Sequence, residues 1–235
     1  MIALSLDDGV ATVTLDRPAA RNALSTKDWC VLAEVMAGVP DDARVVLVGS
    51  SVPGVFSAGA DLVDLARLID DVPARAAFRR AMADAMEAIR ARPMPVVAWI
   101  DGGCFGAGVA LALACDLIVA SPAARFAIPP ARLGIGYPAP DVARLAARVG
   151  AAQAARLLFT ARPVDAAEAV RIGLADLLSD GAEIAREIAA NDADALRLLK
   201  RTLRDPAAPG LDAAFEASFS SPTFAKGVAH YRRTP

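Results

Sequence analysis

Two short bends of small residues are the part of this sequence best suited to chemistry. They are residues 56–62 (FSAGADL) and residues 101–108 (DGGCFGAG), and each follows an apolar run and opens into a helical pattern. Backbone N–H groups in the first turn of a helix have no partner within the helix and lie at the positive end of its dipole. Two such bends could direct two N–H groups at one oxygen and form an oxyanion hole. That arrangement suits the carbonyl group of a thioester.

Strands and helices that could position these bends follow from the hydrophobic pattern. Residues 10–15 alternate as a strand does. The runs 44–48, apolar after Arg44, and 95–100 predict buried strands, and the second of these leads directly into the second bend. Helical spacing predicts helices that start near Ser25 and that cover residues 61–69, 73–90 and 109–114. Repeated strand, bend and helix units indicate an α/β fold.

From about residue 151 the pattern is wholly helical. It predicts helices over 151–160, 164–172, 181–191 and 194–204, then a linker at 205–210 and one last helix. We expect residues 1–180 to form the core domain and residues 181–235 a C-terminal helical region.

Composition narrows the classes of function. The chain has 235 residues, of which 55% are hydrophobic, and a net charge of −2, so we expect one packed domain and no nucleic-acid partner. No apolar run is long enough for a membrane span, and cytoplasm is the expected location. His230 is the single histidine; we expect it at the surface. This scarcity disfavours a Ser-His-Asp hydrolase and a metal site, so no metal is expected. No prosthetic group is expected either.

Several further motifs occur in order along the chain. With the two bends, they are residues 15–18 (LDRP), 21–25 (RNALS), 115–120 (CDLIVA), 125–129 (RFAIP), 133–135 (LGI), 166–169 (AAEA) and 172–174 (IGL). Together they resemble the enoyl-CoA hydratase/isomerase family, also called the crotonase superfamily, from residue 10 to about 231. The resemblance implies a crotonase-like spiral of ββα turns whose C-terminal helices join subunits into homotrimers, often paired as hexamers. It implies acyl-CoA or enoyl-CoA as the ligand.

The resemblance also assigns residues to a site. The backbone N–H groups of Ala60 and Ala107 would be the oxyanion-hole donors. The residues that would bind coenzyme A are Arg17, Ala23, Leu24, Ala58, Ala60, Asp61 and Leu62, with Phe224 and Lys226 brought by a C-terminal helix over the cleft of a neighbouring subunit. Arg17 could bind a phosphate through two hydrogen bonds, and Asp61 could hold the bend by accepting backbone N–H groups. The alternative is that both bends only allow close packing of helix on strand.

The acid–base residues depart from the family's pattern. The two glutamates that hydratases use align with Ala110 and Pro130, and neither residue can carry a proton. Asp141 is a tentative substitute acid or base, with Tyr137 as a weaker one; alternatively Asp141 is a helix N-cap. Asp64 and Arg67 could border the acyl pocket or lie on a solvent face. Its wall could include Leu65, Leu68, Phe78 and Met82, which would otherwise be core residues.

Three functions remain open. The first is an acyl-CoA enzyme that has a backbone oxyanion hole but weak or altered chemistry. The second is a non-catalytic protein that binds and presents acyl-CoA. The third is a structural subunit of a hetero-oligomer.

Overall fold

The computed structural model describes residues 1–231, and the side chains of residues 1–229. The expectation for His230 therefore falls outside the described side chains. The strands are β1 (Ile2–Asp7), β2 (Val10–Leu15), β3 (Ala23–Leu24), β4 (Val45–Ser50), β5 (Val55–Ser57), β6 (Gly59–Ala60), β7 (Val96–Ile100), β8 (Gly103–Phe105), β9 (Leu117–Ala120), β10 (Arg125–Ala127), β11 (Val164–Asp165) and β12 (Leu177–Leu178). The helices are α1 (Thr26–Ala37), α2 (Leu62–Arg67), α3 (Val72–Arg90), α4 (Ala107–Ala114), α5 (Ala139–Thr160), α6 (Ala166–Arg171), α7 (Gly181–Ala189), α8 (Ala193–Arg204), α9 (Leu211–Ser218) and α10 (Pro222–Tyr231), with 3₁₀ turns η1 (Pro18–Ala20) and η2 (Pro130–Leu133).

The strands form three sheets. The largest has the order β1-β2-β4-β7-β9-β12, a second has the order β11-β10-β8-β5, and β3 pairs with β6. From β2 to β12 the largest sheet is parallel, and β1 is antiparallel to β2. Parallel strands need a crossover connection, and here each crossover includes a second strand and a helix.

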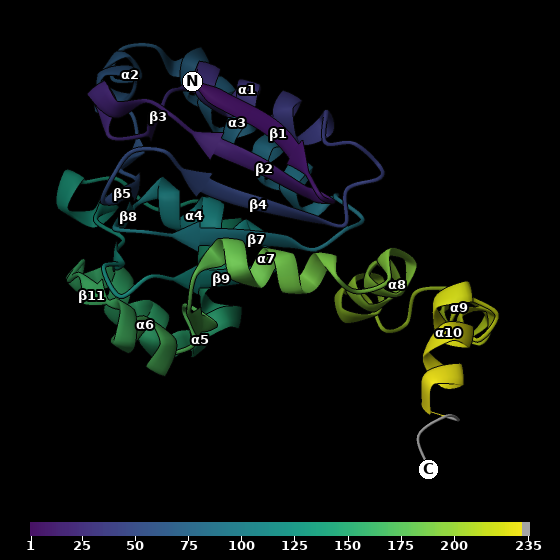
Figure 1. The fold of residues 1–235 in the computed structure, drawn as a ribbon. Coiled ribbons are helices and arrows are strands. Elements are labelled where there is room, and N and C mark those ends of the chain that lie inside the picture. Colours follow the sequence, from purple (N-terminus) through teal and green to yellow (C-terminus); the bar gives the residue numbers. More distant parts are fainter. Residues whose placement is uncertain (232–235) are drawn as a thin grey trace.

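The chain repeats one course through these sheets. It runs from β4 to β5, from β7 to β8 and from β9 to β10, passing each time from the largest sheet to the second, and then enters α2, α4 or η2 and α5. Figure 1 shows the largest sheet crossing the molecule with β5 and β8 at one end of it. The predicted α/β fold with a spiral of ββα turns is confirmed.

Both faces of the largest sheet are covered. Along β4, Val46 and Val48 belong to the main core, whereas Val45 and Leu47 pack with Ala185 of α7. Side chains alternate between the two faces of a strand, so a strand covered on both sides is apolar throughout. This explains why residues 45–48 form a continuous apolar run.

The C-terminal part differs from its sequence prediction. Residues 164–172 are not one helix, because Val164–Asp165 is strand β11, and Leu177–Leu178 is strand β12. The helix predicted over residues 151–160 is the second half of α5, which is interrupted at Gly150, where φ is 77° and ψ is 155°. The last helix is two helices, α9 and α10, which lie beyond α8 and away from the sheets (Figure 1). Two-residue strands have no periodicity to detect.

Helix α8 is fixed to the core by a buried cation. The Lys200 Nζ donates to the Met94 carbonyl at 2.7 Å and lies 2.5 Å from the Asp116 carboxylate, and Lys200 is 6% exposed. Burial lowers the pKa of Lys200, and Asp116 opposes this effect.

The boundary between the two predicted domains, at residue 180, stays a prediction. Among the described residues, no helix is both long and apolar enough to traverse a bilayer.

Replacement of the buried ammonium should destabilise the protein measurably. Lys200→Met keeps the apolar stem but leaves the Met94 carbonyl without its donor, so we expect the free energy of unfolding to fall by about 1–3 kcal/mol. The matched control is Lys27→Met, since Lys27 is exposed and should change this free energy by less than about 0.5 kcal/mol. Urea unfolding measures both; equal effects would contradict the anchoring role of Lys200.

Candidate functional site

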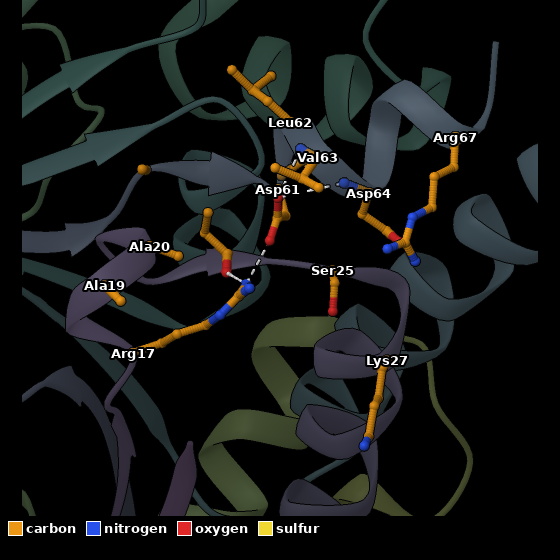
Figure 2. Close-up of a pocket in the computed structure, with 13 residues that line it drawn as sticks. Arg17, Ala19, Ala20, Ser25, Lys27, Asp61, Leu62, Val63, Asp64 and Arg67 are labelled. Carbon is orange, nitrogen blue, oxygen red and sulfur yellow. Dashed lines mark hydrogen bonds and ion pairs between the residues drawn. The ribbon is translucent and has the colours of Figure 1, made fainter.

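A pocket of about 760 Å³ lies between η1, the β3–β6 pair and α2. Figure 2 shows its lining, which consists of Arg17, Ala19, Ala20, Ala23, Ser25, Lys27, Ala58, Ala60, Asp61, Leu62, Val63, Asp64 and Arg67. Six of the seven predicted ligand-binding residues from the first bend and its surroundings are among them. The seventh, Leu24, is buried in β3 and belongs to the core.

The β3–β6 pairing sets the direction of the first bend's N–H groups. Leu24 pairs with Ala60 in parallel register, and the Asp61 N–H donates to the Leu24 carbonyl at 3.0 Å. Alternate residues of a parallel strand bond to the same neighbour, so the Ala60 N–H turns away from β3. Within residues 1–231 it donates to no acceptor. It is therefore available to a ligand.

Within the second bend, Gly106 precedes helix α4, and its φ of 51° favours glycine. Helix α4 begins at the next residue, Ala107, and the N–H groups of Val109 and Ala110 turn back to the Gly106 carbonyl. Among the described residues, the Ala107 N–H has no hydrogen-bond acceptor. This is the orphan donor expected in the first turn of a helix.

The two bends touch through glycines. A Cβ on Gly59, where φ is +96°, would lie 2.6 Å from the Phe105 oxygen and 3.1 Å from the Ala107 nitrogen. A Cβ on Gly108 would lie 2.9 Å from the Ser57 Cβ. The structure thus brings the Ala60 and Ala107 peptides next to each other, although Ala107 is not part of the pocket lining.

Two buried polar residues hold the first bend, and the sequence reasoning missed both. The Asn22 Nδ2 donates to the Phe56 carbonyl at 3.0 Å and to Ser50 Oγ at 2.7 Å. Ser57 Oγ donates to the Asn22 carbonyl at 2.7 Å and accepts from the Gly59 N–H at 3.1 Å. Asn22 has a φ of 55°, and asparagine tolerates the left-handed region better than most residues. An asparagine before a short strand was the available signal.

Arg17 and Asp61 are paired with each other at the pocket. One nitrogen of Arg17, Nη1, lies 2.7 Å from the Asp61 carboxylate and 3.3 Å from that of Asp28, and it donates to the Ala23 carbonyl at 2.7 Å. Figure 2 draws the contact between Arg17 and Asp61. Burial raises the pKa of Asp61, but Arg17 and the Val63 and Asp64 N–H groups outweigh it, so the net pKa is lowered. Asp61 caps α2, as expected.

Asp64 and Arg67 differ in their surroundings. Asp64 accepts hydrogen bonds from the Thr26 N–H and the Thr26 hydroxyl, both at 2.7 Å. It therefore joins α2 to the start of α1 and does not lie on a solvent face, as the alternative reading had it. Arg67 is exposed at the pocket, as Lys27 is. The sequence reasoning did not single out Lys27.

Asp141 lies on a second pocket, of about 540 Å³, between α3 and the start of α5. Its carboxylate is 4% exposed and pairs with the Arg144 guanidinium. Burial raises its pKa, and Arg144 opposes that effect. Pro138 takes the cap position, so the N-cap alternative for Asp141 is wrong. Of the predicted acyl-wall residues, Met82 lines this second pocket.

The remaining predicted positions contain no ionisable side chain or lie elsewhere. Ala110 is fully buried in α4, and Pro130 opens η2. Phe224 and Lys226 are on α10, which Figure 1 places at the opposite end of the molecule from α2. Phe224 is 44% exposed and contacts Phe219, ring edge to ring face. Neither α10 residue reaches the first pocket of the same chain.

Contact between the bends should depend on Gly59. We expect Gly59→Ala to lower the free energy of unfolding by about 2–4 kcal/mol, because the added Cβ combines left-handed strain with overpacking against Phe105. Gly54→Ala is the matched control, since Gly54 also has positive φ, +70°, but open space around its Cβ position. We expect it to cost about 1 kcal/mol. Similar losses in thermal unfolding would refute a tight contact at Gly59.

Comparisons with known proteins agree on one family. The sequence profile of the enoyl-CoA hydratase/isomerase family matches residues 5–229. The chain is 33% identical over 234 residues to the Mycobacterium leprae protein named "Probable enoyl-CoA hydratase echA8", covering 95% of this chain and 84% of that protein. An Arabidopsis thaliana protein, "Probable enoyl-CoA hydratase 2, mitochondrial", is 36% identical over 174 residues, 73% of this chain but only 57% of its own length.

Solved structures give the same result. An enoyl-CoA hydratase/isomerase family protein from Hyphomonas neptunium has a TM-score of 0.89 at 34% identity, covering 98% of this chain and 94% of that one. An enoyl-CoA hydratase from Bacillus anthracis has a TM-score of 0.88 at 27% identity, with 100% and 97% covered. These matches span both bends, all three sheets and the C-terminal helices. The chain belongs to the enoyl-CoA hydratase/isomerase family.

Proposed function

We propose that this protein binds acyl-CoA thioesters, with the thioester oxygen held by the N–H groups of Ala60 and Ala107. The observation that carries the proposal is the contact of the two bends through Gly59, which sets two peptides with unpaired N–H groups side by side. Paired backbone donors stabilise negative charge on a carbonyl oxygen, as an enolate requires. The thioester is a substrate or ligand, and no prosthetic group is invoked.

Coenzyme A would occupy the 760 Å³ pocket. Small residues at its wall, including Ala58 and Ala60, allow close approach to the backbone, and exposed Leu62 offers an apolar contact. Arg17, Lys27 and Arg67 supply positive charge for the phosphates. Phe224 and Lys226 would come from a neighbouring subunit of a homotrimer or hexamer. Because α10 lies far from the pocket of its own chain, only assembly could place it there (Figure 1).

Hydration is expected to be weak. Where hydratases use two glutamates, this chain has Ala110 and Pro130, and each acid–base group is typically worth ~10²–10⁴ in rate. Asp141 was the predicted substitute, but its carboxylate pairs with Arg144 at the second pocket. The absence of both glutamates favours a second candidate function, a non-catalytic protein that presents acyl-CoA.

The cytoplasmic location stays a prediction.

Calorimetry can separate binding of the acyl-pantetheine part of the ligand from the attraction between its phosphates and the basic residues of the pocket. We expect hexanoyl-CoA to bind the wild type in calorimetry, and the Lys27→Gln/Arg67→Gln variant to bind it several-fold more weakly, since exposed charge pairs contribute about 0.2–1 kcal/mol each. Hexanoyl-pantetheine, which lacks the nucleotide phosphates, should bind both proteins equally. No binding of any acyl-CoA by the wild type would leave only the structural role in a hetero-oligomer.

Hydration of crotonyl-CoA tests the chemistry. Ordinary enzymes turn over at about 1–10³ per second, and we expect a rate at least about 10²-fold below that range for lack of both glutamates. Asp141→Asn should leave any residual rate within about threefold, because its partner Arg144 already holds the carboxylate. A fall of ~10²–10⁴ would instead identify Asp141 as the acid or base. Wild-type turnover in the ordinary range would refute the loss of hydratase chemistry.

A further inference from the structure

Tyr137 makes one polar contact that the proposed site does not yet explain. Its hydroxyl donates to the Gly106 carbonyl at 3.0 Å, which links the segment before α5 to the second bend across 31 residues. The side chain is partly buried against the main core. Tyr137 therefore lies beside Gly106, at the start of α4.

The acceptor of this bond belongs to a particular peptide group. The Gly106 carbonyl and the Ala107 N–H are the two ends of one planar amide, which shares its electrons by resonance. A hydrogen bond to the carbonyl shifts electron density toward oxygen and makes the N–H a stronger donor. The Val109 N–H donates to the same carbonyl at 2.9 Å, so Tyr137 adds a side-chain donor to a peptide already polarised by its helix.

The same contact fixes the direction of the Ala107 N–H. Gly106 has no side chain to restrict its backbone, and its φ and ψ are 51° and −118°. Its own N–H is held by the Ala127 carbonyl at 2.9 Å. With Tyr137 on the carbonyl, both peptides that flank the Gly106 Cα are anchored, and rotation of the Gly106–Ala107 amide would break a bond.

We propose that Tyr137 is a positioning residue that orients and polarises the Gly106–Ala107 peptide, so that Ala107 is a stronger donor to the thioester oxygen. This inference rests on the proposed function, because it needs the Ala107 N–H to meet that oxygen. Tyr137 then acts through a peptide group and exchanges no proton with the ligand.

The surroundings of the phenol keep it in the donor form. Burial raises the pKa of Tyr137 well above its ordinary range, and the Asp141 carboxylate and Cys104 raise it further. The backbone of Ala110 and the Arg144 guanidinium act in the opposite direction. The hydroxyl thus remains protonated at neutral pH, which suits a donor and not a base.

Infrared spectroscopy of a bound thioester reads this effect directly. The probe is hexanoyl-CoA with a ¹³C-labelled carbonyl, which has no double bond to hydrate. We expect the carbonyl stretch to move to lower frequency in the wild type, and the shift to shrink by about a tenth to a third in Tyr137→Phe. Phenylalanine keeps the ring packing and removes only the hydroxyl.

Fluorotyrosine gives a graded test that does not depend on the folding of the phenylalanine variant. The chain has two tyrosines, so in a Tyr231→Phe background labelling affects Tyr137 alone. Each added ring fluorine makes the phenol more acidic and a stronger donor while keeping the hydrogen bond. The carbonyl shift should increase along the series from tyrosine to mono-, di- and trifluorotyrosine, with Tyr231→Phe bearing ordinary tyrosine as the control.

The outcomes separate the two proposals. A wild-type carbonyl shift that is the same across the fluorotyrosine series would overturn the role of Tyr137 and leave the oxyanion hole standing. Absence of any shift in the wild type, with hexanoyl-CoA bound, would overturn the oxyanion hole and the inference with it. A shift that increases with phenol acidity supports both.

Discussion

Close approach of two backbone segments is the constraint on which the rest of this structure depends. Gly59 meets the Phe105–Ala107 backbone and Gly108 meets Ser57 at distances that leave no room for a Cβ. The spiral of ββα turns makes this possible, since it carries β5 and β8 side by side in the second sheet and directs the following residues toward one place. Helix α4 starts within the second bend and is apolar and buried on every side, so it anchors this bend in the core.

A site built from main-chain groups tolerates side-chain change differently from one built from side chains. The backbone N–H groups of Ala60 and Ala107 would keep their positions if other side chains replaced these alanines, provided that the neighbouring glycines are kept. Acid–base chemistry has no such protection, because a single replacement removes it. At the two positions where the proposal expects the glutamates of hydratases, Ala110 and Pro130 have no group that can hold a proton. In the proposed site, the geometry that binds the ligand is therefore independent of the groups that would transfer protons.

The sequence predicted the long elements and the local motifs better than the contacts between them. Strand β2 and helices α1 and α3 were found within about a residue, because alternation and helical spacing are local signals. Strands β11 and β12 were missed, since two residues have no period. Six predicted ligand residues line one pocket because they come from three short motifs, two of which β3 and β6 pair together. The Asn22–Ser57 network, the Tyr137–Gly106 bond and the pairing of Asp141 with Arg144 needed the tertiary structure.

The manner in which Arg17 is held has a consequence for recognition. All its contacts with Ala23, Asp28 and Asp61 use Nη1, so the guanidinium is fastened at one corner while its other nitrogens have no role in that network. A long side chain ordinarily loses much of its rotational freedom when it meets a partner. Here that loss occurs during folding. The Arg17 side chain is therefore already ordered before an anion binds in this pocket.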